Sequence, residues 1–135
     1  MRSATRPEPT EPPHFSSWIG EIDIPIAGFE PAIVIFPDTA EKKPLIVVAH
    51  GAGGQASWHC RHWHGFIGND AILLCPRGKR QYARDPSKGY YFPDHPSLGR
   101  EVLAALAALR LQAGSKIASG PVTYAGYSQG ATMVT

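Results

Sequence analysis

The sequence predicts an α/β fold, in which helices cover both faces of a mostly parallel sheet to make a three-layer sandwich. Residues 45–49 and 71–75 are uninterrupted apolar runs, a pattern typical of strands buried on both faces. A helical pattern over residues 97–113 separates the second run from a third, milder one at 122–125. Strands that alternate with helices in this way predict successive βαβ units.

The chain has 135 residues, of which 43% are hydrophobic and 18% charged, enough for one core. Residues 1–16 are rich in proline and polar side chains and are expected to form a flexible leader, with no signal-peptide h-region. Residues 17–135 are expected to form one domain.

No stretch approaches the roughly 18 apolar residues of a membrane span, so a soluble cytoplasmic protein is expected. The net charge of +2 is too small to indicate nucleic acid, and the expected partner is a small molecule. The oligomeric state is left open.

Two strands are expected near the start of the domain, at 18–26 and 32–36. They are separated by breaks at Ala27-Gly28 and at Glu30-Pro31. Pro25 lacks an N–H group, which favours an edge position for the first of them. The two are therefore expected to pair antiparallel at the margin of a larger sheet.

Two helices are expected between the buried strands, at 55–67 and at 97–113. In the second helix apolar residues recur at helical spacing on an alanine-rich background. Ser97 is expected to cap its start and Gly114 to end it. The residues of this apolar face are Leu98, Val102, Leu106 and Leu109.

The third buried strand leads into a short glycine–serine motif, Gly126-Tyr127-Ser128-Gln129-Gly130, which precedes a potential helix. A sharp strand-to-helix turn strains the backbone at its serine and needs small residues two positions away on either side. The serine oxygen would then project at the carboxyl edge of the sheet, near a helix N-terminus that favours negative charge. Ser128 is therefore the candidate nucleophile.

A second motif follows the first buried strand, namely His50-Gly51-Ala52-Gly53-Gly54. Together, the two motifs resemble those of the α/β-hydrolase superfamily, in particular its carboxylesterase, phospholipase-like and dienelactone-hydrolase branches. The resemblance implies a serine hydrolase that cleaves carboxylic ester or related acyl bonds through an acyl-enzyme at Ser128, without cofactor or metal. It also implies an oxyanion hole made by the backbone N–H groups of Gln129 and Ala52, with Gly53 as the next choice for the second donor.

The sequence departs from this family after the nucleophile. The superfamily places its Asp or Glu and then its His downstream of the serine, but residues 129–135 contain none of these. The chain is therefore expected to hold the first half of the domain, truncated after the nucleophile elbow, and to be inactive and marginally folded alone. His50 is not expected to replace the missing base, because the family places it beside the oxyanion hole.

Two other functions remain open from the sequence. Gly51, Gly53 and Ala56 also fit the G-x-G-x-x-A pattern of a dinucleotide-binding loop, with Arg77 available for a 2′-phosphate. This reading leaves the serine motif unexplained. A hydrolase-fold protein that binds without catalysis is the other alternative.

Several smaller features are also left with two interpretations. The cluster His59, Cys60 and His62 suggests a metal site but fits better as part of a helix over the site, with Trp58 and Trp63 packing or lining the acyl pocket. Whether Cys60 pairs with Cys75 is not decided by spacing. The basic loop could orient an anionic substrate or simply be solvated; it comprises Arg77, Lys79, Arg80 and Arg84. The aromatic run Tyr90, Tyr91 and Phe92 could wall the pocket or pack under the second helix.

Overall fold

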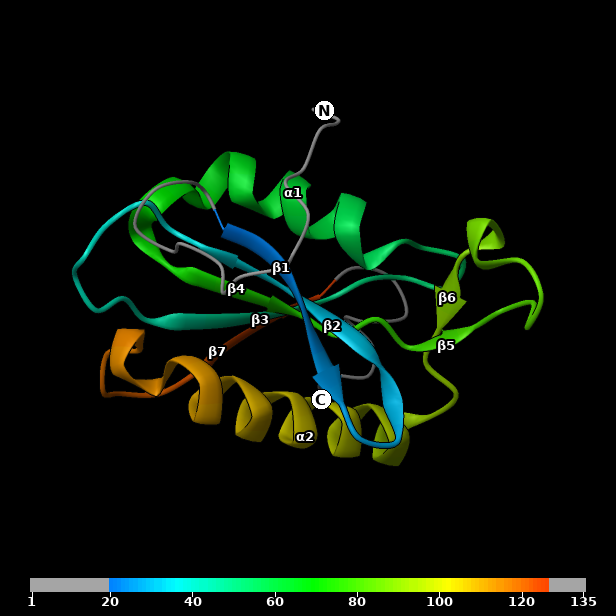
Figure 1. Cartoon of the computed structure of the whole chain (residues 1–135). Coiled ribbons are helices and arrows are strands. Elements are labelled where there is room, and N and C mark those ends of the chain that lie inside the picture. Colours follow the sequence, from blue (N-terminus) through cyan, green and yellow to red (C-terminus); the bar gives the residue numbers. More distant parts are fainter. Residues whose placement is uncertain (1–19, 127–135) are drawn as a thin grey trace, which may run out of the picture.

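The structure is a computed structural model, and it describes residues 20–126. The predicted leader at 1–16 lies outside these residues, as do Ser128 and Gln129. Seven strands and two α-helices are assigned within the described range (Figure 1). The strands are β1 (Gly20–Ile26), β2 (Phe29–Phe36), β3 (Leu45–Ala49), β4 (Ile72–Cys75), β5 (Lys79–Arg80), β6 (Tyr90–Tyr91) and β7 (Thr123–Gly126), and the α-helices are α1 (Ala56–Ile67) and α2 (His95–Ala113).

Five strands form the main sheet, in the order β1-β2-β4-β3-β7, while β5 and β6 form a separate hairpin. The prediction of a mostly parallel sheet is wrong, because the sheet is mixed. Strands β4, β3 and β7 run parallel, whereas the β1–β2 and β2–β4 pairings are antiparallel. The reversal occurs because β2 returns directly from β1 through a tight turn instead of a helical crossover.

The β1–β2 hairpin confirms the predicted antiparallel pair at the sheet margin. Its turn uses Gly28 at φ 85°, a backbone conformation that side chains other than glycine rarely adopt. The predicted break at Glu30-Pro31 is wrong, since both residues lie inside β2. In β1 the register shifts between Ile24 and Ile26. Pro25 lies at this irregularity, where the ladder can accommodate a residue that has no N–H group to donate.

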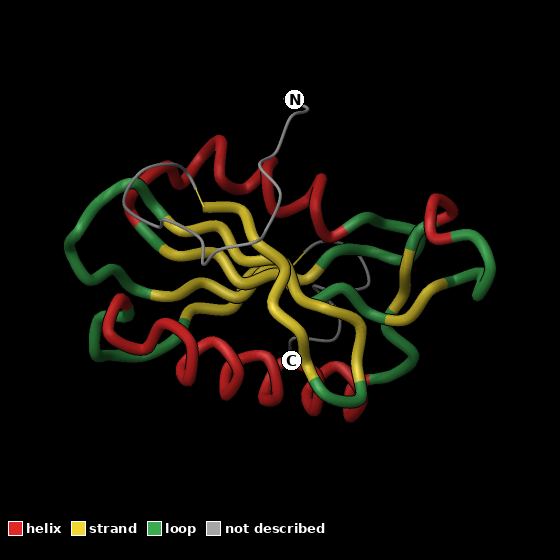
Figure 2. The backbone as a smooth tube through the Cα atoms, viewed as in Figure 1, coloured by secondary structure: helices red, strands yellow, loops and turns green. Residues whose placement is uncertain are grey.

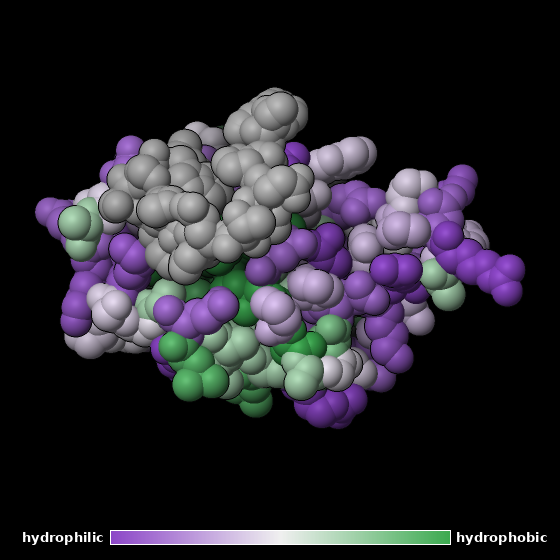
Figure 3. Space-filling model, in the orientation of Figure 1, coloured by the Kyte–Doolittle hydropathy of each residue, from purple (hydrophilic) through white to green (hydrophobic). Residues whose placement is uncertain are grey.

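The two α-helices lie on opposite faces of the sheet and make three layers, as predicted (Figure 2). Helix α1 packs on β2, β3 and β4, and α2 packs on the other face against β1. Each face has its own buried apolar cluster. The outer surface of α2 also carries exposed leucines, Leu103 and Leu111, and Figure 3 shows apolar surface over the part of the molecule where α2 lies.

Helix α2 begins two residues before the predicted start. The carboxylate of Asp94 accepts the N–H of Ser97 at 2.7 Å, so Asp94 is the N-cap and the prediction for Ser97 is wrong. Asp is as good a cap as Ser, and the first turn tolerates the intervening proline. The hydrogen bonds from Ser97 lower the pKa of Asp94. Gly114 ends the helix as predicted.

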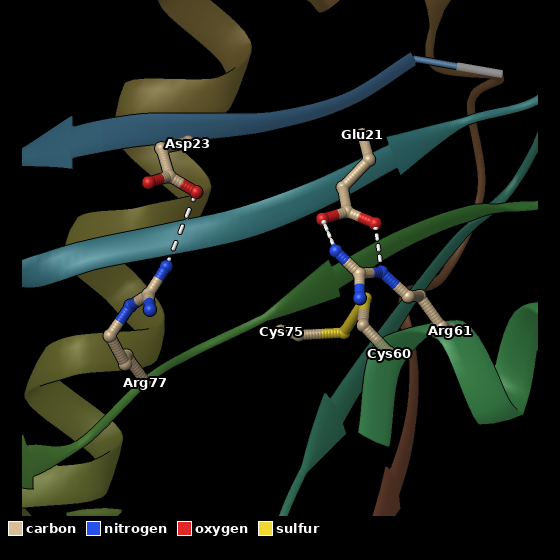
Figure 4. A network of polar contacts seen from close by, with 6 residues as sticks. All are labelled: Glu21, Asp23, Cys60, Arg61, Cys75 and Arg77. Carbon is tan, nitrogen blue, oxygen red and sulfur yellow. Dashed lines mark hydrogen bonds and ion pairs between the residues drawn. A yellow bond between two sulfur atoms is a disulfide. The ribbon is translucent and has the colours of Figure 1, made fainter. Parts of the chain in front are cut away.

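A disulfide joins Cys60 to Cys75 and settles the pairing that the sequence left open (Figure 4). It fastens α1 to the end of β4, and both cysteines are fully buried. A second connection ties α1 to the edge strand, because the guanidinium of Arg61 donates to both carboxylate oxygens of Glu21 at 2.6 and 2.7 Å. Within residues 20–126, no helix has the length and apolarity to cross a bilayer.

Candidate functional site

The carboxyl ends of β3 and β7 lie side by side, because these strands are parallel neighbours. Their register pairs Ala49 with Gly126, the last residue of each strand. The loop that starts at His50 therefore begins beside the residue that opens the serine motif. The remainder of that motif, including Ser128 and Gln129, lies outside the described residues. Of the predicted site, the structure thus places the loop and the first glycine of the elbow together.

His50 is buried and holds the loop to its neighbours. Its Nδ1 lies 2.6 Å from the carbonyl oxygen of Gly51, and its Nε2 lies 2.6 Å from that of Arg77. Its ring also packs on Phe92, with 4.7 Å between ring centroids. Since both nitrogens face backbone acceptors, the ring is placed to fasten the loop after β3 to the loop after β4 rather than to act as a base.

The backbone N–H groups of the loop divide into two sets. Gly53 donates its N–H to the carbonyl of Tyr90 at 2.8 Å, and Gly54 donates to that of Gly51 at 3.0 Å. Within residues 20–126, neither Gly51 nor Ala52 donates its N–H to an acceptor. Gly53, the second choice for an oxyanion donor, is therefore already engaged, while the first choice, Ala52, is not.

The segment between β5 and β6 packs tightly against the same loop. Gly54 accepts the N–H of Tyr90 at 2.9 Å, and the Gln55 side chain donates to the carbonyl of Pro86 at 3.0 Å. Gly89 has φ 95°, and a Cβ atom there would collide with the backbone of Gly53. The 79–91 segment thus supports the loop through close backbone contact that only glycine permits.

An open hollow of about 610 Å³ lies beside the loop, a volume within the range of small-molecule sites. It lies between the loop and the first turns of α1. Trp58 is 71% exposed here. The hollow is lined by His50, Gly51, Ala52, Gly53, Gly54, Gln55, Trp58, His59 and His62.

His59 has a defined hydrogen-bonding state. Its Nε2 accepts the indole N–H of Trp63 at 3.1 Å, so the proton of the neutral ring lies on Nδ1. Burial lowers the pKa of His59, and His50 and His62 lower it further. The lowered pKa favours the neutral form of the ring.

The residues considered for metal binding do not form a site. The sulfur of Cys60 is bonded to Cys75. Within the described part of the chain, no group of three or more His, Cys, Asp or Glu side chains could hold a metal ion. This cluster belongs to α1, with His59 and His62 directed to the hollow.

Arg77 is not placed for the phosphate of a dinucleotide. Its guanidinium donates to Asp23 at 3.2 Å (Figure 4). It also donates to the carbonyl of Pro31 at 2.8 Å and packs 5.7 Å from the ring centroid of Tyr90. Arg80, from the same basic loop, pairs with Glu30 at 3.6 Å. Two of the four cations proposed to orient an anionic substrate are therefore directed to carboxylates of the β1–β2 hairpin.

The aromatic run at the end of the 79–91 segment, which continues to Phe92, packs inward. Phe92 is fully buried in the cluster under α2, and Tyr90 is 5% exposed. None of the run lines the hollow. Packing under the helix is therefore the interpretation that holds for Phe92.

Glu101 is a supporting residue that sequence reasoning missed. It is buried on α2, and its carboxylate accepts the N–H of Gly78 at 2.9 Å in the loop after β4. Burial raises the pKa of Glu101, although hydrogen bonds from Gly78 and Arg77 oppose this rise. Its position could have signalled burial, because it follows Leu98 by three residues on the apolar face of the helix.

A second hollow, of about 770 Å³, lies between the β1–β2 turn, the loop after β4 and the start of α2. Its walls include Lys79 and Arg100 as well as the ion pair Arg80–Glu30. No residue of the 50–55 loop or of β7 contributes to it. It is therefore separate from the candidate site.

Comparison with known proteins shows similarity of fold but not of sequence family. No family model matches the chain, and no curated protein matches it. The structure is similar to that of TT1662 from Thermus thermophilus, with a TM-score of 0.59 and 16% identity over 87% of this chain and 50% of that one. It is also similar to esterase Est22 in its structure with p-nitrophenol, with a TM-score of 0.61 and 18% identity over 86% of this chain and 36% of that one.

An esterase from Pyrobaculum calidifontis gives a TM-score of 0.56 and 22% identity over 87% of this chain and 37% of its own. The chain thus spans half or less of each of these proteins. At these identities the similarity shows a shared fold alone.

Proposed function

We propose that this chain carries the nucleophile and the oxyanion loop of a serine hydrolase that cleaves carboxylic esters. The observation that carries the proposal is the register of Ala49 with Gly126, which sets the 50–55 loop beside the entry to the Ser128 motif. In a strand–turn–helix of this kind the serine attacks the ester carbonyl and forms an acyl-enzyme. The esterase structures that share the fold support this reaction class.

The oxyanion hole would use two backbone N–H groups, from Gln129 and Ala52. Ala52 suits this role because its N–H has no acceptor within residues 20–126. Glycines on both sides of it let a substrate approach the backbone. Each donor aimed at the developing oxyanion lowers the barrier by roughly 3–4 kcal/mol in related hydrolases.

The acid and base of the reaction would come from outside these 135 residues. Residues 129–135 contain no Asp, Glu or His, and both nitrogens of His50 face backbone carbonyls. Without its base, a serine nucleophile loses a factor of about 10⁶ in rate, or roughly 8 kcal/mol of barrier. The 135-residue chain alone is therefore proposed to be inactive.

The decisive experiment is fluorophosphonate labelling of the 135-residue chain and of a form that extends beyond residue 135. The extended form is expected to be labelled stoichiometrically, and Ser128→Ala to abolish the label. Ser119→Ala, at an exposed position before β7, is the matched control and should be labelled like the parent. Labelling that persists in Ser128→Ala would refute the assignment of the nucleophile. A folded extended form that takes no label would favour a hydrolase-fold protein that binds without catalysis.

The disulfide bears on where this enzyme would act. The cytoplasmic location expected from the sequence conflicts with the Cys60–Cys75 bond, because disulfides are rare where thiols are kept reduced. Thiol alkylation of the protein, carried out directly in extracts of its own cells, would distinguish a cytoplasmic location from an oxidising compartment. If both cysteines are alkylated, the cytoplasmic location is supported. If both are protected from alkylation, the disulfide is present and an oxidising compartment is supported.

A further inference from the structure

Trp58 presents an exposed indole at the mouth of the hollow. It lies in the first turn of α1, directly after the oxyanion loop, and is 71% exposed. Trp63, on the same helix, is half-buried and hydrogen-bonded to His59. An open indole beside a concave site of small-molecule size is suited to stack on a flat apolar ligand group.

The walls of the hollow carry no Asp, Glu, Lys or Arg among the residues that the structure describes. Three of its side chains are imidazoles. Burial and its histidine neighbours lower the pKa of His59, which favours its neutral form. The hollow therefore offers hydrogen-bonding groups and an aromatic surface, and the described part of its wall offers no carboxylate or ammonium to a ligand.

Two arginines of the surrounding elements are directed elsewhere. Arg61 of α1 donates both of its hydrogen bonds to Glu21, and Arg77 is directed to Asp23 and the carbonyl of Pro31. In Figure 4 both guanidinium groups point toward carboxylates of β1. A negatively charged group that entered the hollow would lose hydration without gaining a cation from these residues.

From these observations we infer that the hollow binds an uncharged, flat apolar group of the ester substrate, with Trp58 as its specificity-determining contact. The inference rests on the proposed function, and it names the substrate class of the same site. An aromatic acyl group stacks on the indole, while its carbonyl lies toward Ala52 in the adjacent loop. An ester whose acyl group carries a carboxylate is a poor substrate.

A binding experiment on the 135-residue chain tests this without requiring turnover. Methyl benzoate and benzoate are titrated separately while the amide resonances of residues 50–55 are followed by two-dimensional NMR. Methyl benzoate is expected to shift them saturably, and benzoate to bind at least roughly tenfold more weakly. Equal or tighter binding of benzoate overturns the inference.

Three variants separate the role of Trp58 from general effects. Trp58→Ala is expected to weaken methyl benzoate binding about tenfold, since an aromatic contact contributes about that factor. Trp58→Phe should retain most of the affinity. Leu103→Ala, at an exposed apolar side chain of α2 outside the hollow, should leave binding unchanged. Unchanged binding in Trp58→Ala overturns the inference.

The failure of this inference can be distinguished from the failure of the proposed function. Ser128→Ala should keep methyl benzoate binding while an extended form loses turnover. In an active extended form, 4-nitrophenyl butyrate should exceed 4-nitrophenyl hemisuccinate in kcat/KM by about tenfold or more. Ser128-dependent turnover that favours the hemisuccinate would overturn the substrate class and leave the hydrolase assignment intact.

Discussion

The Nε2 atom of His50 lies 2.6 Å from the carbonyl oxygen of Arg77, so one buried imidazole joins the loops that follow β3 and β4. These loops leave neighbouring parallel strands at the same edge of the sheet. The ring thereby fixes the start of the 50–55 loop from its buried side.

His50→Ala is expected to lower the free energy of unfolding by about 2–4 kcal/mol, because it leaves a cavity and removes the ring that contacts the carbonyls of Gly51 and Arg77. Urea unfolding followed by circular dichroism measures this. His62→Ala, at an exposed ring on the same hollow, should change stability by less than about 0.5 kcal/mol. Equal effects of the two substitutions would contradict the role given to His50.

Reduction of the Cys60–Cys75 bond is expected to destabilise the chain by about 3 kcal/mol, since the bond closes a loop over a sequence separation of 15. Thermal unfolding with and without a reductant measures the effect. The double variant Cys60→Ala/Cys75→Ala is the control and should show no response to reductant. A response in that variant would trace the effect to some other cause.

Glu101→Gln should alter the pH dependence of stability. The raised pKa of Glu101 means that its contribution is complete below the unfolded-state value, near 4.5, and is lost as pH rises through the folded-state value. Glutamine keeps an acceptor for Gly78 but carries no charge. The variant should therefore gain on the parent protein between pH 4 and pH 7 in urea unfolding.

Glu41→Gln is the matched control, because the Glu41 carboxylate lies just before β3 and is exposed. It should follow the parent protein across this pH range. A pH-independent difference between Glu101→Gln and the parent would contradict the raised pKa.

Gly89→Ala is expected to cost at least about 1–3 kcal/mol, because alanine is strained at φ 95° and its Cβ would collide with the backbone of Gly53. Gly99→Ala should instead stabilise by roughly 0.5–1 kcal/mol, since Gly99 lies within α2 with open space around it. Thermal unfolding of the two variants gives the comparison. Similar behaviour would show that the 79–91 segment does not rest on the loop as described.

The buried strands and helices were predictable because their residue patterns are local. The run 45–49 coincides with β3, and the helix expected at 55–67 is observed one residue shorter at its start. The direction of β2 relative to β4 was not predictable, since an apolar run reads the same in either orientation. The cap of α2 was missed because Asp94 and Ser97 are both good caps, and only the hydrogen bond distinguishes them.

The site was predictable in its residue types but not in its supports. The His-Gly loop followed from its place after a buried strand. The choice between Ala52 and Gly53 as the candidate oxyanion donor depended on whether either N–H is already bonded. The N–H of Gly53 is bonded to the carbonyl of Tyr90, which lies 37 residues from Gly53 along the chain. The same holds for Glu101 and the Cys60–Cys75 pair, whose partners are brought together only by tertiary packing. Ser128 itself remains a prediction.

The pairing of Ala49 with Gly126 has a consequence for how this protein could vary. The position of Gly126 beside the loop is set by a ladder of main-chain hydrogen bonds, so exchanging side chains within β7 leaves that position alone. Inserting or deleting a single residue in β7 would shift the residues after the change by one step along the strand, about 3.3 Å, and turn alternate side chains to the other face. Length, more than composition, is what this strand has to preserve.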